Sequence, residues 1–271
     1  IGYEEGIATY FTSLFTLKKT AWVHCDYHYY KNKNKRAEKN AYKNIDQIVC
    51  VSKHTSKSFK NYYPSLENKI TYAYNLLNEK EILILSNKQI TDKRFNNSQF
   101  TIISIGRYDP IKQFDRIPDI VEQIFNMGKG AAFKWYIIGS GNDEYTKIIQ
   151  TNIQKYQLQD TIILLGSKNN PYPYIKNSNI LVSTSLSEAC PYVINEAKIL
   201  NKIVVSTNYE SASELIGKDN GIITPLDKMH TILYDLINDI NSKYTILNNN
   251  VSKYNFDTTK DKNRIINIIN Q

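Results

Sequence analysis

The 271-residue sequence lacks the features that mark several classes of protein. Its apolar runs are short, as in residues 162–165, and none approaches the roughly 18 residues that a membrane-spanning helix needs. Only three cysteines occur, Cys25, Cys50 and Cys190, and no two of them form a CxxC pair. A disulfide framework and a cysteine-based zinc site are therefore not expected, whereas a reducing compartment is.

The sequence also lacks a strong imbalance of charge. Lysine and arginine number 34 against 26 aspartate and glutamate residues, which gives a formal net charge of +8. The excess is spread along the chain, so no nucleic-acid partner is expected. The charge is compatible with an anionic small molecule or an acidic membrane surface as partner.

What the sequence does contain is an alternation of short apolar runs with amphipathic segments. The runs are rich in Ile and Val and continuously apolar, which is typical of strands buried on both faces of a parallel sheet. The predicted strands span residues 20–23, 47–51, 70–73, 100–105, 134–138, 161–165, 179–183, 203–206 and 221–223. The predicted helices span residues 35–42, 56–62, 79–85, 116–125, 143–156, 192–200, 211–215 and the tail 255–271. This alternation predicts an α/β protein.

The order of these elements predicts two domains, as does the length at roughly 150 residues per domain. Residues 1–76 hold too few strands for a complete doubly wound sheet and indicate a partial N-terminal domain. The polar segment 77–99 is predicted to be a linker. Residues 100–254 are predicted to form a complete C-terminal domain, and residues 255–271 a helix that packs back toward the N-terminal domain.

The loops after the predicted strands are candidate sites, because ligands of open parallel sheets bind beyond the carboxyl ends of the strands. The loop after residues 100–105 turns at Gly106 and carries Arg107 and Lys112. An arginine fork and a lysine point charge could together hold an anionic group. A solvated loop is the alternative interpretation.

The loop after residues 134–138 contains two glycines, Gly139 and Gly141. A GxGxxG fingerprint would need a third glycine where Glu144 stands, so a dinucleotide site is not supported. A glycine turn before a helix and a contact with a phosphate both remain open.

The most informative motif is EACPYVINE, which starts at Glu188. Pro191 suits the first turn of a helix, because the N–H that proline lacks would have no acceptor there. The N–H groups of Tyr192 and Val193, with the positive end of the helix dipole, then form an anion site. Glu188 and Glu196 flank this site and could bind vicinal hydroxyls. The motif therefore predicts a phosphorylated sugar as ligand.

Two other features allow two interpretations each. His24 ends the first predicted strand and is either a structural histidine or a polar group that faces the ligand crevice. The basic run Lys31 to Arg36 is either a solvated loop or a contact with a phospholipid surface or a polyprenyl-phosphate acceptor.

The sequence resembles glycosyltransferase family 4 over nearly its whole length. That family comprises retaining, nucleotide-sugar-dependent enzymes of the GT-B fold, in which two Rossmann-like domains face a cleft. The resemblance rests on the Glu-x7-Glu pattern of EACPYVINE and, in the family's order, on IGRYDPIK, IIGSGND, LLGSKNNPYPYI and NGIITP. In the first half, AWVHCD and IDQIVCVSKHTSKSF resemble the family's N-terminal domain. The family's first strands would lie before Ile1, so the N-terminal domain is expected to be incomplete.

The resemblance implies roles for individual residues. Arg107 and Lys112 would bind the donor diphosphate and stabilise the leaving group, and His24 would face the reaction centre. Glu188 would hold sugar hydroxyls, and Glu196 would bind the ribose hydroxyls. The other donor-binding residues would be Gly106, Gly139, Gly166, Ser167, Lys168, Ala189, Cys190, Pro191, Tyr192 and Val193. Ala189 and Cys190 replace the family's more usual glycine and large apolar residue, which is expected to change donor selectivity.

The implied function is transfer of a sugar, with retention, from a nucleotide-sugar to a saccharide or lipid-linked acceptor. The resemblance places this reaction in the biosynthesis of surface polysaccharides, in the cytoplasm or at the inner face of the membrane. The sequence contains no DxD motif, so no cofactor and no essential metal are expected, and cations would supply the positive field. The alternatives are a nucleotide-sugar epimerase, a phosphorylase and a non-catalytic nucleotide-sugar-binding module.

Overall fold

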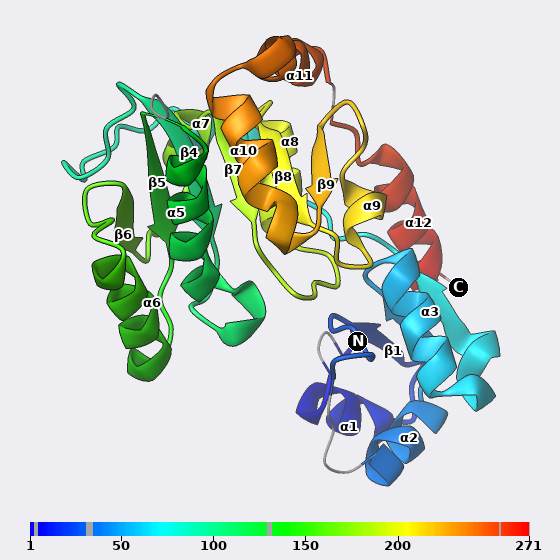
Figure 1. Cartoon of the computed structure of the whole chain (residues 1–271). Coiled ribbons are helices and arrows are strands. Elements are labelled where there is room, and N and C mark those ends of the chain that lie inside the picture. Colours follow the sequence, from blue (N-terminus) through cyan, green and yellow to red (C-terminus); the bar gives the residue numbers. More distant parts are fainter. Residues whose placement is uncertain (3–4, 31–34, 129–131, 255, 271) are drawn as a thin grey trace. The chain divides into compact units, whose positions relative to one another are not determined.

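The computed structural model describes residues 1–2, 5–30, 35–128, 132–254 and 256–270. They form two compact units (Figure 1). The first unit comprises Ile1–Leu77, Ser187–Tyr192 and Asp257–Gln271, and the second comprises Asn78–Leu186 and Val193–Phe256. The short segment Ser187–Tyr192 thus belongs with the first unit, although the residues on either side of it in the chain belong to the second.

The first unit contains a parallel sheet in the order β1-β2-β3. Its strands are β1 (Thr20–Val23), β2 (Gln47–Cys50) and β3 (Ile70–Tyr72). Its helices are α1 (Ile7–Ser13), α2 (Lys35–Lys43), α3 (Lys53–Tyr62) and α12 (Thr259–Asn270). The guanidinium of Arg264, on α12, lies 3.9 Å from the centroid of the Tyr72 ring, so the last helix packs on the third strand.

Aromatic side chains dominate the core of the first unit. The rings of Tyr27 and Phe59 meet edge to face with centroids 4.6 Å apart, and Tyr42 packs on Phe59 at 4.9 Å. Glu38 is fully buried among them and accepts hydrogen bonds from the hydroxyls of Tyr27 and Tyr63 at 3.0 and 2.6 Å. Burial raises the pKa of both tyrosines, which therefore remain donors to this carboxyl group.

The second unit is a six-stranded parallel sheet in the order β6-β5-β4-β7-β8-β9. Its strands are β4 (Phe100–Ile105), β5 (Phe133–Ile138), β6 (Ile162–Gly166), β7 (Ile180–Ser183), β8 (Ile203–Thr207) and β9 (Gly221–Thr224). This is the strand order of a doubly wound Rossmann sheet, with its switch point between β4 and β7. The loops that follow these two strands are therefore where a ligand is expected.

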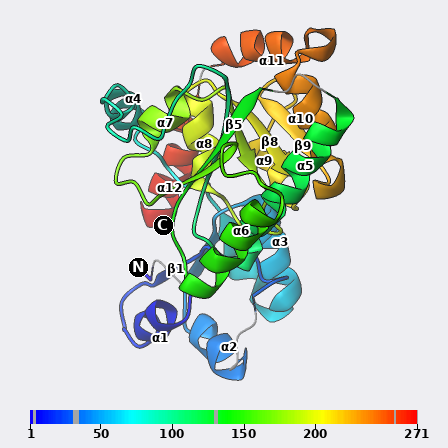
Figure 2. The same cartoon turned by 60° about the vertical axis from the view of Figure 1, so that its left-hand side comes forward.

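Helices cover both faces of this sheet. Figure 2 shows α5 (Ile117–Met127), α6 (Asp143–Lys155) and α10 (Met229–Ile237) on one side of it, with α7 (Tyr172–Lys176) and α8 (Tyr192–Ile199) on the other. The remaining helices of the unit are α4 (Glu79–Ser86), α9 (Ala212–Leu215) and α11 (Lys243–Ser252). Because both faces are covered, the strands must be apolar throughout, which explains the continuous runs in the sequence.

The fold class predicted from the sequence is confirmed, and each predicted strand is present within two residues of its expected ends. The sequence did not predict α1, α7, α10 or α11. Pro171 directly precedes α7, and Pro173 lies in its first turn. Prolines so close together are typical of a loop, although proline also fits the first turn of a helix. The three adjacent asparagines of α11 are poor helix formers and concealed that helix.

The segment expected to be a linker packs onto the second unit. The carboxylate of Asp92 pairs with Arg94 at 2.6 Å and with Lys168 at 2.9 Å. Arg94 also donates to the carbonyls of Leu164 and Leu165, at the end of β6. Hydrogen bonds from Arg94 and Lys168 hold the pKa of Asp92 well below its usual range. The structure therefore assigns residues 78–99 to the second unit.

Candidate functional site

The loops that follow β4 and β7 are joined directly at the switch point of the second unit. The Leu186 amide donates to the carbonyl of Ile111 at 2.8 Å, and the Thr184 hydroxyl donates to the carbonyl of Lys112 at 2.6 Å. The loop with the two predicted cations thus lies beside the chain that leads into the EACPYVINE motif. The structure thus joins the β4 loop to the residues just before the motif, with Thr184 and Lys112 bonded across 72 residues of sequence.

The two cations of the β4 loop differ in their surroundings. The aliphatic stem of Lys112 lies against Gly106, where an added Cβ would come within 3.2 Å of Lys112 Cε. Arg107 is 76% exposed and its Nε is 3.7 Å from Asp109, which is a long and solvated ion pair. Such a pair contributes little stability, so exchanging it for an anionic ligand costs little. Lys112 is thus held in place by packing, whereas Arg107 can turn toward a ligand.

The two glycines of the β5 loop serve the packing of this loop against the β4 loop. A Cβ on Gly139 would lie 1.8 Å from the carbonyl oxygen of Gly106, and one on Gly141 would lie 2.0 Å from that of Tyr108. The Tyr108 amide donates to the Ser140 carbonyl at 2.8 Å across this contact. Close packing of the two loops therefore explains why glycine stands at both positions, without a phosphate contact. This agrees with the glycine-turn alternative. A contact between Gly139 and the donor stays a prediction.

The β6 loop joins the same group of loops. Gly166 has a φ of +72°, and its carbonyl accepts a hydrogen bond from the Gly139 amide at 3.1 Å. The Ser167 hydroxyl lies 2.8 Å from that of Ser140. The ammonium of Lys168 instead donates to Asp92 and to the Leu165 carbonyl, both at 2.9 Å. Lys168 therefore ties residue Asp92 to the end of β6. Its place near the nucleotide base stays a prediction.

Helix α8 begins directly after Pro191, as the sequence predicted, and carries Glu196 in its second turn. The Tyr172 hydroxyl, on α7, donates to Glu196 Oε1 at 3.4 Å. Burial raises the pKa of Glu196 above its ordinary value, and this hydrogen bond opposes the shift only in part. When Glu196 is ionised, water and Tyr172 therefore stabilise its charge only in part. Hydroxyl groups of a bound ligand could donate further hydrogen bonds to this carboxylate. Tyr172 could not be identified as a partner of Glu196 from the sequence, because the two residues lie on different helices and only the fold brings them together.

The first five residues of the motif, from Glu188 to Tyr192, belong to the first unit. Glu188 is half-buried, whereas Ala189, Cys190 and Pro191 are buried. His24, also in the first unit, follows β1, and its amide and that of Cys25 donate to the carboxylate of Glu5. The sequence did not single out Asp26, which lies two residues beyond His24 and is buried with four hydrogen-bond donors around it.

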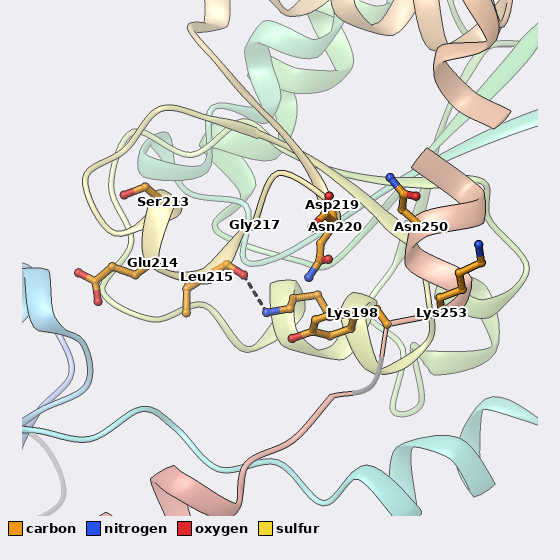
Figure 3. Close-up of a pocket in the computed structure, with 10 residues that line it drawn as sticks. Lys198, Ser213, Glu214, Leu215, Gly217, Asp219, Asn220, Asn250 and Lys253 are labelled. Carbon is orange, nitrogen blue, oxygen red and sulfur yellow. Dashed lines mark hydrogen bonds between the residues drawn. The ribbon is translucent and has the colours of Figure 1, made fainter. Parts of the chain in front are cut away.

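A pocket of about 550 Å³ opens elsewhere in the second unit, between α8, α9 and α11 (Figure 3). It is lined by Lys198, Ser213, Glu214, Leu215, Gly217, Asp219, Asn220, Asn250, Lys253 and Tyr254. Lys198 donates to the Leu215 carbonyl at 2.8 Å, and its ammonium lies 5.2 Å from the Tyr254 ring centroid. None of the lining residues belongs to the set predicted from the sequence. The pocket holds cations and carboxylates together, so its charge favours no single class of ligand.

Two further searches cover the described part of the chain. Within it, no group of three or more His, Cys, Asp or Glu side chains is placed to hold a metal ion. No helix in the same part of the chain is both long enough and apolar enough to cross a membrane.

Comparison with known proteins is consistent with this geometry. A Methanocaldococcus jannaschii protein named "Uncharacterized glycosyltransferase MJ1059" is 31% identical over 182 residues, which cover 64% of this chain and 42% of that protein. The Staphylococcus aureus capsular polysaccharide biosynthesis glycosyltransferase CapH is 25% identical over 185 residues, covering 63% of this chain and 51% of CapH. The chain thus spans about half or less of the length of these relatives.

A solved structure shares the fold. Anabaena Alr3699/HepE, crystallised with UDP and glucose, matches with a TM-score of 0.79 at 18% identity, over 94% of this chain and 72% of HepE. The predicted GT-B class, with two Rossmann-like α/β units, is thereby confirmed. The sequence model of the family described as "Glycosyl transferases group 1" matches residues 86–256, which is more than half of the chain. The chain therefore belongs to the group 1 glycosyltransferases.

Proposed function

We propose that this chain is the donor-binding part of a retaining glycosyltransferase of family 4, which transfers a sugar from a UDP-sugar. The observation that carries the proposal is the pair of hydrogen bonds that joins the cationic β4 loop to the β7 loop at the switch point. The HepE structure holds UDP and glucose, which supports the choice of uridine for the donor. The capsular polysaccharide role printed for CapH supports a saccharide or lipid-linked acceptor in the synthesis of a surface polysaccharide.

The proposed chemistry centres on the departing nucleoside diphosphate. As the glycosidic bond breaks, negative charge develops on the β-phosphate, and fixed cations near that oxygen lower the barrier. Arg107 and Lys112 are proposed to supply this charge, together with the N-terminal end of α8. No essential metal is proposed, so transfer would persist in EDTA. Glu188 would hold the sugar, Glu196 would bind the ribose hydroxyls, and His24 would face the reacting carbon.

Retention is proposed to occur by front-face attack, in which the acceptor oxygen approaches on the side from which the diphosphate leaves. The departing phosphate oxygen would then accept the proton of the acceptor hydroxyl. This assignment rests on the family resemblance, in which no side chain of the motif acts as a covalent nucleophile.

Contact with an acidic lipid surface is also proposed. Of the basic run from Lys31 to Arg36, the first four residues lie outside the described part of the chain, and Lys35 and Arg36 are exposed at the start of α2. Helix α1 packs beside α2 (Figures 1 and 2). Phe11 on α1 and Leu14, just past its end, are 64% and 77% exposed. Exposed cations and exposed apolar side chains on two neighbouring helices suit the interface of an anionic bilayer.

The proposed diphosphate site predicts a loss of nucleotide affinity when its cations are removed. The double variant Arg107→Ala, Lys112→Ala should bind UDP at least about 100-fold more weakly, because two charge-assisted hydrogen bonds are lost at roughly 1.5–3 kcal/mol each. Titration calorimetry with UDP measures this. Arg116→Ala is the control, since it removes a cation of the same unit that pairs with Asp119. Equal affinities for UDP in the wild type and the double variant would refute the site.

The half-buried carboxylate of Glu196 predicts opposite effects on binding and stability. Its folded pKa is raised above the ordinary value of 4.5, so ionisation penalises the folded state at neutral pH and not below pH 4.5. Glu196→Gln should therefore raise the free energy of unfolding at pH 7, by an amount that vanishes as the pH falls below 4.5. The same variant should weaken UDP binding about tenfold or more, because the amide is a poorer acceptor for two ribose hydroxyls.

Urea unfolding measures the stability effect within the second unit. A Trp22→Phe background leaves Trp135, which is buried in the second unit, as the fluorescent reporter. Glu122→Gln, on α5 of the same unit, serves as the control. A stability difference for Glu196→Gln that does not change with pH would contradict the buried-carboxylate account.

The proposed lipid contact predicts binding to vesicles that contain phosphatidylglycerol but not to vesicles of pure phosphatidylcholine. Phe11→Ser with Leu14→Ser should reduce this binding at least about tenfold, because each side chain contributes roughly 1.5–3 kcal/mol when it leaves water. Co-sedimentation measures the bound fraction. Ile148→Ser with Ile246→Ser, which alters two exposed apolar residues of the second unit, is the control. The contact is disproved if both double variants bind as the wild type does.

A further inference from the structure

A buried carboxylate in the first unit gathers donors from several segments. Asp26 is 6% exposed and lies in the turn after β1. Its Oδ1 accepts hydrogen bonds from the Ser58 hydroxyl at 2.8 Å and the His28 amide at 2.9 Å. Its Oδ2 accepts from Ser187, and His54 Nε2 lies 3.1 Å from it. Burial alone would raise the pKa of Asp26, but the hydrogen bonds from His28, Ser58 and His54 outweigh it and hold the pKa low.

Ser187 is the donor that stands apart, because it comes from a distant part of the chain. Its hydroxyl lies 3.3 Å from Asp26 Oδ2, across 161 residues of sequence. A second bond follows three residues later, where the Asn75 side chain donates to the Cys190 carbonyl at 3.2 Å. Asn75 and Cys190 are both buried. The segment Ser187–Tyr192 is thus fixed to the first unit at two points.

The two points of attachment bracket Glu188. The segment has only Glu188 and Ala189 between Ser187 and Cys190, and Glu188 is the half-buried member of the four. A carboxylate that must meet sugar hydroxyls depends on its backbone being held, since a displacement of about 1 Å can cost about 100-fold in rate. Groups of this kind are usually oriented by a second layer of hydrogen bonds.

We infer that Asp26, acting through Ser187, is a positioning residue that orients Glu188 toward the sugar of the donor, with Asn75 as a second anchor. The inference rests on the proposed function, since it gives Glu188 a sugar as its partner. It concerns the sugar and not the nucleotide, because Asp26 and Glu188 belong to the first unit, whereas Arg107, Lys112 and Glu196, which are proposed to bind the nucleotide, belong to the second.

The variant that tests this inference is Ser187→Ala, because it removes one donor and leaves the other three on Asp26. It should leave the affinity for UDP within about twofold, while the affinity for the matching UDP-sugar falls about tenfold. Ser187→Thr keeps a hydroxyl and should restore that affinity. Ser58→Ala is the matched control, since it also removes one hydroxyl donor from Asp26 but leaves the bond between Asp26 and Ser187 in place. Calorimetry with UDP, UDP-glucose and UDP-N-acetylglucosamine gives each affinity.

A double-mutant cycle identifies Asp26 as the group through which Ser187 acts. If Ser187 acts through Asp26, Ser187→Ala should have little further effect on UDP-sugar affinity in an Asp26→Asn background. Additive losses in the cycle, or a loss in Ser58→Ala equal to that in Ser187→Ala, would overturn the inference. If the wild type binds none of the three probes, the proposed function fails. If it binds a UDP-sugar and Ser187→Ala binds it equally well, the positioning role alone fails.

Discussion

The reversal of strand order between β4 and β7 is the constraint on which the candidate site depends. Because all six strands run parallel, both strands deliver their loops to the same edge of the sheet. The loops then bond to each other through the carbonyls of Ile111 and Lys112. In the β4 loop, Lys112 packs against Gly106, and Arg107 is exposed. The site proposed for the diphosphate therefore depends first on this topology and only then on the side chains that the loops carry.

Much of this could be predicted from the sequence, because the signals are local. A strand that is buried on both faces must be continuously apolar, so β4 to β9 were visible as Ile- and Val-rich runs. Pro191 marked the start of α8, since proline is tolerated in the first turn. The candidate loops were then found by a topological rule that needs only the order of the elements. Helices such as α7, which spans only five residues, and α11, which contains three adjacent asparagines, carry weak local signals and could not be found this way.

The parts that could not be predicted are contacts between segments far apart in the chain. For Gly139 and Gly141 the sequence left a glycine turn and a phosphate contact open, and only the fold shows that the backbone of the β4 loop lies against them. The family resemblance placed Lys168 near the nucleotide base, and only the fold shows its ion pair with Asp92. The pKa of Glu196 is raised because the fold takes this carboxyl group partly out of water, which its position in the sequence does not reveal. No sequence signal links Asp26 to Ser187, since only the fold brings them together.

The central claim is that a sugar diphosphate binds where the β4 loop meets the chain that leads into α8. Crystals grown with a UDP-sugar that calorimetry has shown to bind test it most directly. The account predicts electron density for the diphosphate at the start of α8, within hydrogen-bond distance of Arg107 and Lys112. Density for the nucleotide in the pocket beside Lys198 and Lys253, with the β4 loop unoccupied, would contradict it.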